Sequence, residues 1–147
     1  MAASDCLDAF YLALEETPAD RVTLLALADW YDEQGNAEAA ACLRWVAAKG
    51  RCPFRYRRGR LSVQSTAFHD GWYWWATDDP PAGPDWGHSQ ECRLPSALWE
   101  HLRHTFDYRP NNCKEYASVR SAYEALLEAW PLAPQLERPP ARKERRR

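Results

Sequence analysis

The sequence lacks every short motif that would fix a chemistry. It contains no GxGxxG, GxxxxGK[ST], HExxH or GxSxG pattern, so it offers no phosphate-binding loop, zinc-protease helix or nucleophile elbow. It also has no stretch approaching eighteen apolar residues, which a membrane-spanning helix would need. We therefore expect no catalytic residues, no cofactor and no membrane span, and an enzyme is the less favoured interpretation.

Cysteine pairs at metal or redox spacing are also absent. The five cysteines are odd in number and form no CxxC, and the first residues, MAASDCLDAF, lack the basic and apolar stretches of a secretion signal. These features predict a cytoplasmic protein with reduced thiols. One region holds several potential metal ligands, His88, Cys92, His101 and His104. Because zinc ligands usually come in tight CxxC or HxxxH pairs, and these are loosely spaced, we expect no metal site.

Aromatic residues and segregated charge are what the chain does have. Its 147 residues suit one ordinary domain, and eight tryptophans, seven tyrosines and four phenylalanines supply much of the apolar area of a core. The net charge of -2 divides into -7 over residues 1–48, +6 over 49–69, -5 over 70–130 and +4 over 131–147. Such blocks attract partners of opposite charge, so they bear on partners rather than on the fold.

The first fifty residues have the pattern of three helices. An apolar stripe in the first helix is formed by Leu7, Phe10, Tyr11 and Leu14. The second helix begins at Thr17-Pro18 and is apolar on all sides. Gly35 lies just beyond its end, and Asn36 caps a third helix that reaches Gly50. Short connections make the three helices antiparallel neighbours.

Within this region one short residue pattern points to a known family. The matching residues are Leu27-Ala28-Asp29-Trp30, Asp32-Glu33, Gly35 and Arg44. Through them, residues 7–49 resemble the bacterial repeat-companion domain, a short helical module. The resemblance covers about a third of the chain and implies a module with no assigned reaction. The rest of the chain resembles a small uncharacterised bacterial group that carries this module before an aromatic domain.

Asp29 and Arg44 fall among apolar residues on their helical wheels, where a lone charge would be costly to bury. One interpretation is an acid whose pKa is raised for chemistry. The other, which we favour, is a structural ion pair between Asp29 and Arg44, or a cap on a neighbouring helix, that sets how the hairpin packs.

Residues 51–76 predict a three-stranded antiparallel meander. Turns at Arg58-Gly59 and Asp70-Gly71 would separate the strands, and the second turn would pair Phe68 with Tyr73. Alternation along the strands then places Phe54, Tyr56, Leu61, Val63, Trp72 and Trp74 on an inner face. The opposite, outer face would hold Arg55, Arg57, Arg60, Phe68, Tyr73 and Trp75.

Arginines beside aromatics on this outer face would suit single-stranded nucleic acid, since the rings stack on bases and the arginines neutralise phosphates. The alternative is that later helices cover the aromatics and leave the arginines as a solvated rim. Against nucleic acid stands the sequence pI near 6.1.

After residue 77 the pattern becomes helical again. A loop at 78–85 and a short edge element at 86–92 precede a helix that starts at Ser96 and carries Leu98, Trp99, Leu102 and Phe106 on one stripe. A last helix runs from Ser118 to Trp130 and is stopped by Pro131. Residues 132–147 are rich in proline and charge and predict a disordered basic tail, either solvated or weakly attracted to nucleic acid.

The sequence therefore predicts an α+β protein with a helical module at 1–50, an aromatic-rich sheet with two helices at 51–131 and a tail at 132–147. The first two parts would share one core or form two. We expect a non-catalytic protein–protein interaction module that binds another protein through its acidic helical face or its aromatic sheet. The alternative function is single-stranded nucleic acid binding through Arg55, Arg57, Tyr73 and Trp75.

Overall fold

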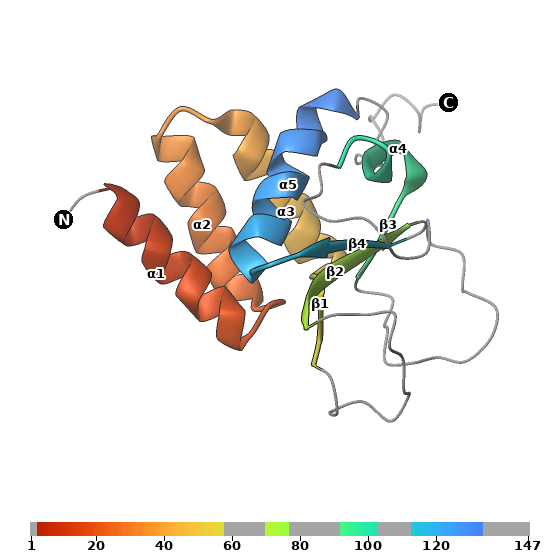
Figure 1. Cartoon of the computed structure of the whole chain (residues 1–147). Coiled ribbons are helices and arrows are strands. Elements are labelled where there is room, and N and C mark those ends of the chain that lie inside the picture. The colour runs from red at the N-terminus through yellow and green to blue at the C-terminus, as the bar shows by residue number, and fades with distance from the viewer. Residues whose placement is uncertain (1–2, 58–69, 77–91, 103–112, 134–147) are drawn as a thin grey trace, which may run out of the picture.

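Helices and a small mixed sheet make up the computed structural model of this chain, which describes residues 3–57, 70–76, 92–102 and 113–133 (Figure 1). The helices are α1 (Ala3–Glu16), α2 (Arg21–Glu33), α3 (Ala37–Lys49), α4 (Ser96–Trp99), α5 (Val119–Ala129) and the short 3-10 helix η2 (Trp130–Leu132). The strands are β1 (Phe54–Tyr56), β2 (Gly71–Ala76), β3 (Arg93–Leu94) and β4 (Cys113–Tyr116). The α+β class predicted from the sequence is confirmed.

The three N-terminal helices follow their sequence signals closely. The Asn36 side chain accepts a hydrogen bond from the amide of Ala39 at 3.0 Å and so caps α3. Gly50 ends α3 with a φ of 67° and Gly35 follows α2 with a φ of 84°, a conformation that favours glycine. The predicted start of α2 at Thr17-Pro18 is wrong, because a turn closed by the Asp20 amide bonding to the Thr17 carbonyl at 3.0 Å comes first.

Strand β2 is the centre of the sheet. Antiparallel β1 and parallel β3 lie along one of its edges, and antiparallel β4 lies along the other. The sheet is therefore mixed and not the predicted three-stranded meander. Tyr73 is paired with Phe54 on one side and Glu115 on the other, so the predicted pairing of Tyr73 with Phe68 is wrong. Phe68 itself lies outside the described residues.

The observed register also changes which side chains share a face. Directly opposite residues of paired strands point to the same side of a sheet, and Phe54 lies opposite Tyr73 while Arg55 lies opposite Trp72. The predicted grouping of Phe54 and Tyr56 with Trp72 and Trp74 is therefore wrong. Trp72 and Trp74 face the main core, whereas Phe54 packs with Tyr56, Tyr73, Trp75, Cys92 and Cys113 in a second cluster. The remaining predicted inner-face residues, Leu61 and Val63, lie outside the described residues.

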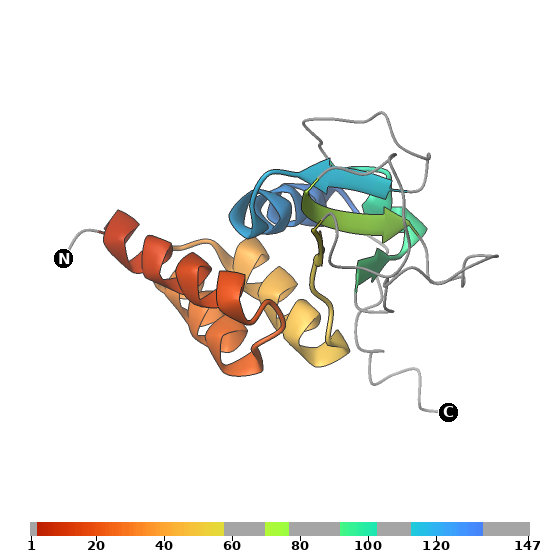
Figure 2. The ribbon, with the colours of Figure 1, turned by 60° about the horizontal axis from the view of Figure 1, so that its bottom comes forward.

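Helix α5 lies between the N-terminal helices and the sheet (Figures 1 and 2). Trp74 is fully buried, and its indole N–H donates to the Ala122 carbonyl of α5 at 3.0 Å. The Tyr123 ring of α5 lies edge-on to Trp74 at 6.0 Å, and its buried hydroxyl donates to the Pro18 carbonyl, before α2, at 2.7 Å. One hydrophobic cluster thus takes residues from α1, α2, α3, α5 and the sheet.

Helix α5 agrees closely with the helix predicted from the sequence, whereas α4 does not. Helix α5 begins directly after Ser118, close to its predicted start, and the Ser118 side chain caps it by accepting from the amide of Ser121 at 3.0 Å. The α-helix ends at Ala129, and the chain continues through Pro131 as the 3-10 helix η2. In contrast, α4 ends at Trp99 and continues as a turn, so the predicted helix from Ser96 is shorter than expected. No helix in the described part of the chain has both the length and the apolar character to cross a membrane.

Candidate functional site

The predicted arginine and aromatic surface is not assembled by the described strands. Tyr73 and Trp75 have exposed fractions of 0% and 5%, and their rings lie 5.7 Å apart in the second cluster. Arg55 is on the opposite face of the sheet, so its predicted position beside these rings is wrong. Arg57 is exposed after the end of β1. The other members of that surface, Arg60 and Phe68, lie outside the described residues.

Arg55 instead contacts the helical side of the molecule. Its guanidinium carbon lies 5.2 Å from the centre of the Trp72 ring, and its Nη1 lies 4.0 Å from Oε2 of Glu15 in α1. A cation over a tryptophan face is attracted by the ring quadrupole. Arg55 therefore links β1, β2 and α1 and does not extend an aromatic surface for bases.

The structure brings Asp29 and Arg44 together on the surface. Nη2 of Arg44 lies 2.8 Å from Oδ1 of Asp29 and 2.7 Å from Oδ2 of Asp32. The Asp29 side chain is 72% exposed, so its predicted place on an apolar face is wrong. The neighbouring residues Val22, Ala26 and Ala41 are exposed as well, so the ion pair lies in water. Exposed pairs of this kind add little to stability.

The candidate metal ligands are not gathered by the described residues. Cys92 is buried beside the sheet and His101 is exposed after α4, while His88 and His104 lie outside the described residues. Among residues 3–57, 70–76, 92–102 and 113–133, no three His, Cys, Asp or Glu side chains are grouped so that they could hold a metal ion.

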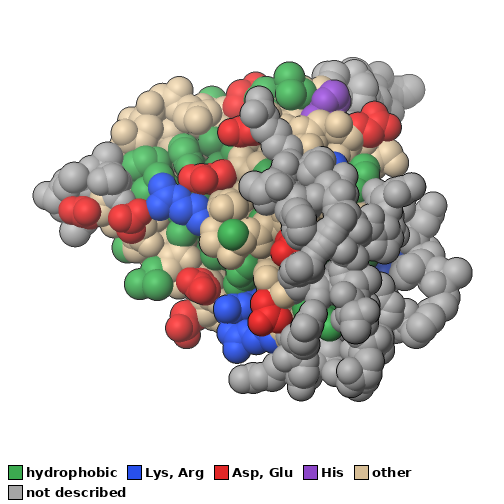
Figure 3. Space-filling model, viewed as in Figure 1, with side chains coloured by type: hydrophobic (Ala, Val, Ile, Leu, Met, Phe, Trp, Pro, Cys, Tyr) green, Lys and Arg blue, Asp and Glu red, His purple; other side chains and the backbone are tan. Residues whose placement is uncertain are grey.

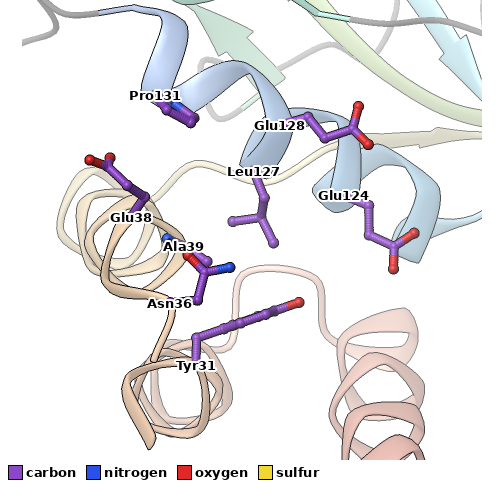
Figure 4. Close-up of a pocket in the computed structure, with 8 residues that line it drawn as sticks. All are labelled: Tyr31, Asn36, Glu38, Ala39, Glu124, Leu127, Glu128 and Pro131. Atoms are coloured by element: carbon purple, nitrogen blue, oxygen red, sulfur yellow. Dashed lines mark hydrogen bonds between the residues drawn. The ribbon is translucent and has the colours of Figure 1, made fainter. Parts of the chain in front are cut away.

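An open groove runs between the α2–α3 turn and the C-terminal helix. Its volume is about 510 Å³, and its lining residues are Tyr31, Asn36, Glu38, Ala39, Glu124, Leu127, Glu128 and Pro131. Figure 4 shows Leu127 pointing from α5 into the space between the two walls, with Tyr31 and Asn36 on the opposite wall. We call this feature the acidic groove. Its volume falls in the range of about 300–1,000 Å³ that is common for ligand pockets.

Three carboxylates surround the acidic groove. Glu38 stands in the first turn of α3, and Glu124 and Glu128 stand one turn apart on α5. Figure 4 shows Glu38 on one side and the two α5 glutamates on the other. Among the described residues that line the groove, the charged side chains are all carboxylates, so their summed charge is negative. Acidic side chains are also spread over the helical half of the face seen in Figure 3.

Glu124 is held in place by a charged cluster behind the groove. Its Oε2 lies 2.9 Å from Nε of Arg120, whose Nη1 lies 2.6 Å from Oδ1 of Asp8 in α1. The Arg120 guanidinium also lies over the Tyr11 ring at 5.1 Å. This cluster joins α1 to α5 and fixes one wall of the acidic groove, although it offsets part of the charge of Glu124.

The floor of the acidic groove is apolar with a polar edge. Tyr31 and Leu127 are half-buried, and Ala39 is buried beneath them. Burial raises the pKa of the Tyr31 phenol above its ordinary value of 10.0, so the group is neutral near pH 7. A neutral phenol can donate and accept hydrogen bonds beside the carboxylates. The lining residues in the described part of the chain include no cysteine, histidine, serine or lysine that could act as a nucleophile.

Sequence patterns identified only part of this site. The acidic character of the N-terminal helices was predicted, and Glu38 belongs to it. Glu124 and Glu128 were missed, although their spacing of four residues beside Leu127 places an acidic edge next to an apolar one. Nothing in the local sequence indicates that this edge lies opposite Tyr31.

Comparison with known protein families, with curated proteins and with solved structures finds no match to this chain.

Proposed function

We propose that this chain is a non-catalytic interaction module that receives a basic segment of another protein in the acidic groove. One observation carries the proposal: three carboxylates surround an open, partly apolar groove of about 510 Å³. The likeness of residues 7–49 to the repeat-companion domain is part of the same proposal, because it implies a module without an assigned reaction.

Two properties of the lining define the partner. Carboxylates favour Lys and Arg, and arginine can bind a carboxylate through two parallel hydrogen bonds. The half-buried surfaces of Tyr31 and Leu127 favour an apolar side chain next to that base. A segment with arginine or lysine close to a leucine or proline therefore fits the acidic groove best.

The same charge argues against nucleic acid at this site, since the three carboxylates would repel phosphates. On the sheet, Arg55 and Tyr73 lie on opposite faces. No observation in the described part of the chain favours the nucleic acid alternative over a protein partner.

Selection from a random peptide library displayed on phage tests the proposal without assuming a partner. The full chain is expected to enrich peptides that combine Arg or Lys with an apolar residue. Their binding should weaken by about five- to thirtyfold in the double variant Glu38→Gln, Glu128→Gln, which corresponds to about 1–2 kcal/mol. Glu124 is left unchanged because Arg120 depends on it.

A matched control separates the groove from overall charge. Glu33 on α2 and Glu100 after α4 are exposed and do not line the groove, so Glu33→Gln, Glu100→Gln removes the same charge elsewhere. The selected peptides should bind this control as they bind the original chain. Enrichment of acidic peptides, or equal weakening in both double variants, would contradict the proposal.

A further inference from the structure

The acidic groove has a basic counterpart in the chain itself. Residues 134–147 carry six bases and two acids, and their bases are Arg138, Arg142, Lys143, Arg145, Arg146 and Arg147. The same segment contains Leu136 and three prolines. It therefore combines the two properties, positive charge and apolar side chains, that the lining of the acidic groove selects.

The segment is also attached next to the groove. Pro131 belongs to the groove lining, and Ala133 is the last described residue before the segment begins. An extended chain spans at most about 3.3–3.6 Å per residue, so Arg142 can reach about 30 Å from Ala133. The segment is thus long enough to return to Glu38 and Glu128 without any change in the fold.

Covalent attachment makes even a weak contact effective. A short tether gives an effective concentration on the order of millimolar. A contact with a dissociation constant of about 0.1 mM would then be formed in about nine molecules of ten. Rim charge pairs and a few apolar contacts are sufficient for an affinity of that order.

We propose that residues 134–147 occupy the acidic groove of their own chain and that a partner must displace them. This inference rests on the proposed function, because it assigns the same groove a second, intramolecular occupant. The segment would act as an autoinhibitory competitor, and its release would control access to Tyr31 and Leu127.

The test uses the full chain and one variant with a neutral segment, in which Arg142, Lys143, Arg145, Arg146 and Arg147 are replaced by glutamine. The probe is a fluorescent synthetic peptide of residues 134–147. The neutral variant is expected to bind this peptide about tenfold more tightly than the original chain, because its groove is open. The control Lys49→Gln, Arg57→Gln, which removes charge outside the segment, should bind as weakly as the original chain.

Amide resonances of the groove provide a direct measurement. Those of Asn36, Ala39 and Leu127 should shift between the original chain and the neutral variant and stay in place in the control. Equal peptide affinity with unshifted resonances would overturn the inference and leave the proposed function standing. Absence of peptide binding in every form would contradict both proposals. Resonances that depend on protein concentration would mean that a second copy supplies the segment, which would also overturn the inference.

Discussion

The thiol of Cys42 should lower the free energy of unfolding as the pH rises, and the substitution Cys42→Ala should remove this pH dependence. Cys42 lies in α3 with an exposed fraction of 0%. Burial raises the pKa of this thiol far above its ordinary value of 9.0, with a smaller contribution from the charge of Glu38. The thiol therefore keeps its proton in the folded chain at pH values where the unfolded chain releases it.

The sign and size of the effect follow from proton linkage. Above pH 9 the unfolded state binds fewer protons than the folded state, so the free energy of unfolding decreases as pH rises. Each pH unit above the thiol pKa of the unfolded chain lowers the free energy of unfolding by about 1.4 kcal/mol. A pH of 10.5 lies about 1.5 units above the ordinary thiol pKa. Cys42 should thus lower the free energy of unfolding by about 2 kcal/mol at pH 10.5 and by almost nothing at pH 8.

Urea unfolding at pH 8 and pH 10.5, with a phosphine reductant present, measures this contribution. The original chain should lose about 2 kcal/mol more than Cys42→Ala between the two pH values. Other titrating groups cancel in the comparison. The control Val46→Ala, at another fully buried site on α3, leaves a comparable cavity without removing a thiol. Its free energy of unfolding should differ from that of the original chain by the same amount at both pH values. A constant difference for Cys42→Ala as well would refute the reasoning.

Three further substitutions test contacts of the fold. Tyr123→Phe should lower the free energy of unfolding by about 1–3 kcal/mol in urea titrations, because the Pro18 carbonyl loses its donor; an unchanged midpoint would contradict this. Gly71→Ala should lower the free energy of unfolding by about 1–3 kcal/mol and lower the melting temperature, since the new methyl would lie 3.0 Å from the Tyr116 carbonyl oxygen. An unchanged melting temperature would show that the backbone of the sheet shifts to accept the methyl group. Arg44→Gln should cost less than about 1 kcal/mol, and the loss should shrink in 1 M salt; a larger, salt-insensitive loss would assign the ion pair a packing role.

Local signals explain why the helices were predictable. The cap at Asn36 and the positive-φ glycines Gly35 and Gly50 each act within a few residues of the chain, so the sequence around them contains the whole interaction. The start of α2 was misplaced because Thr17-Pro18 and Asp20 both have suitable residue types for a helix start. Only the observed turn distinguishes them.

The sheet depends on choices that no local pattern encodes. β1 pairs with β2 across an interval of fourteen residues, from Tyr56 to Gly71, and this register reverses the face expected for Arg55. β4 was missed because Lys114 and Glu115 interrupt the apolar pattern of a strand that is nearly buried. The acidic groove was missed for the same physical reason: its walls are Tyr31 and Glu124, more than ninety residues apart.

The position of α5 has a consequence for synthesis on the ribosome. This helix covers surfaces of α1, α3 and β2, yet Ala129 is made eighty residues after Lys49 completes α3. At a translation rate of about 5–20 residues per second, α5 is completed about 4–16 s after the N-terminal helices whose core it covers. During that interval the apolar groups that later surround Tyr123 are open to water and to chaperones. The chain is therefore expected to acquire its stable fold only after translation has passed α5.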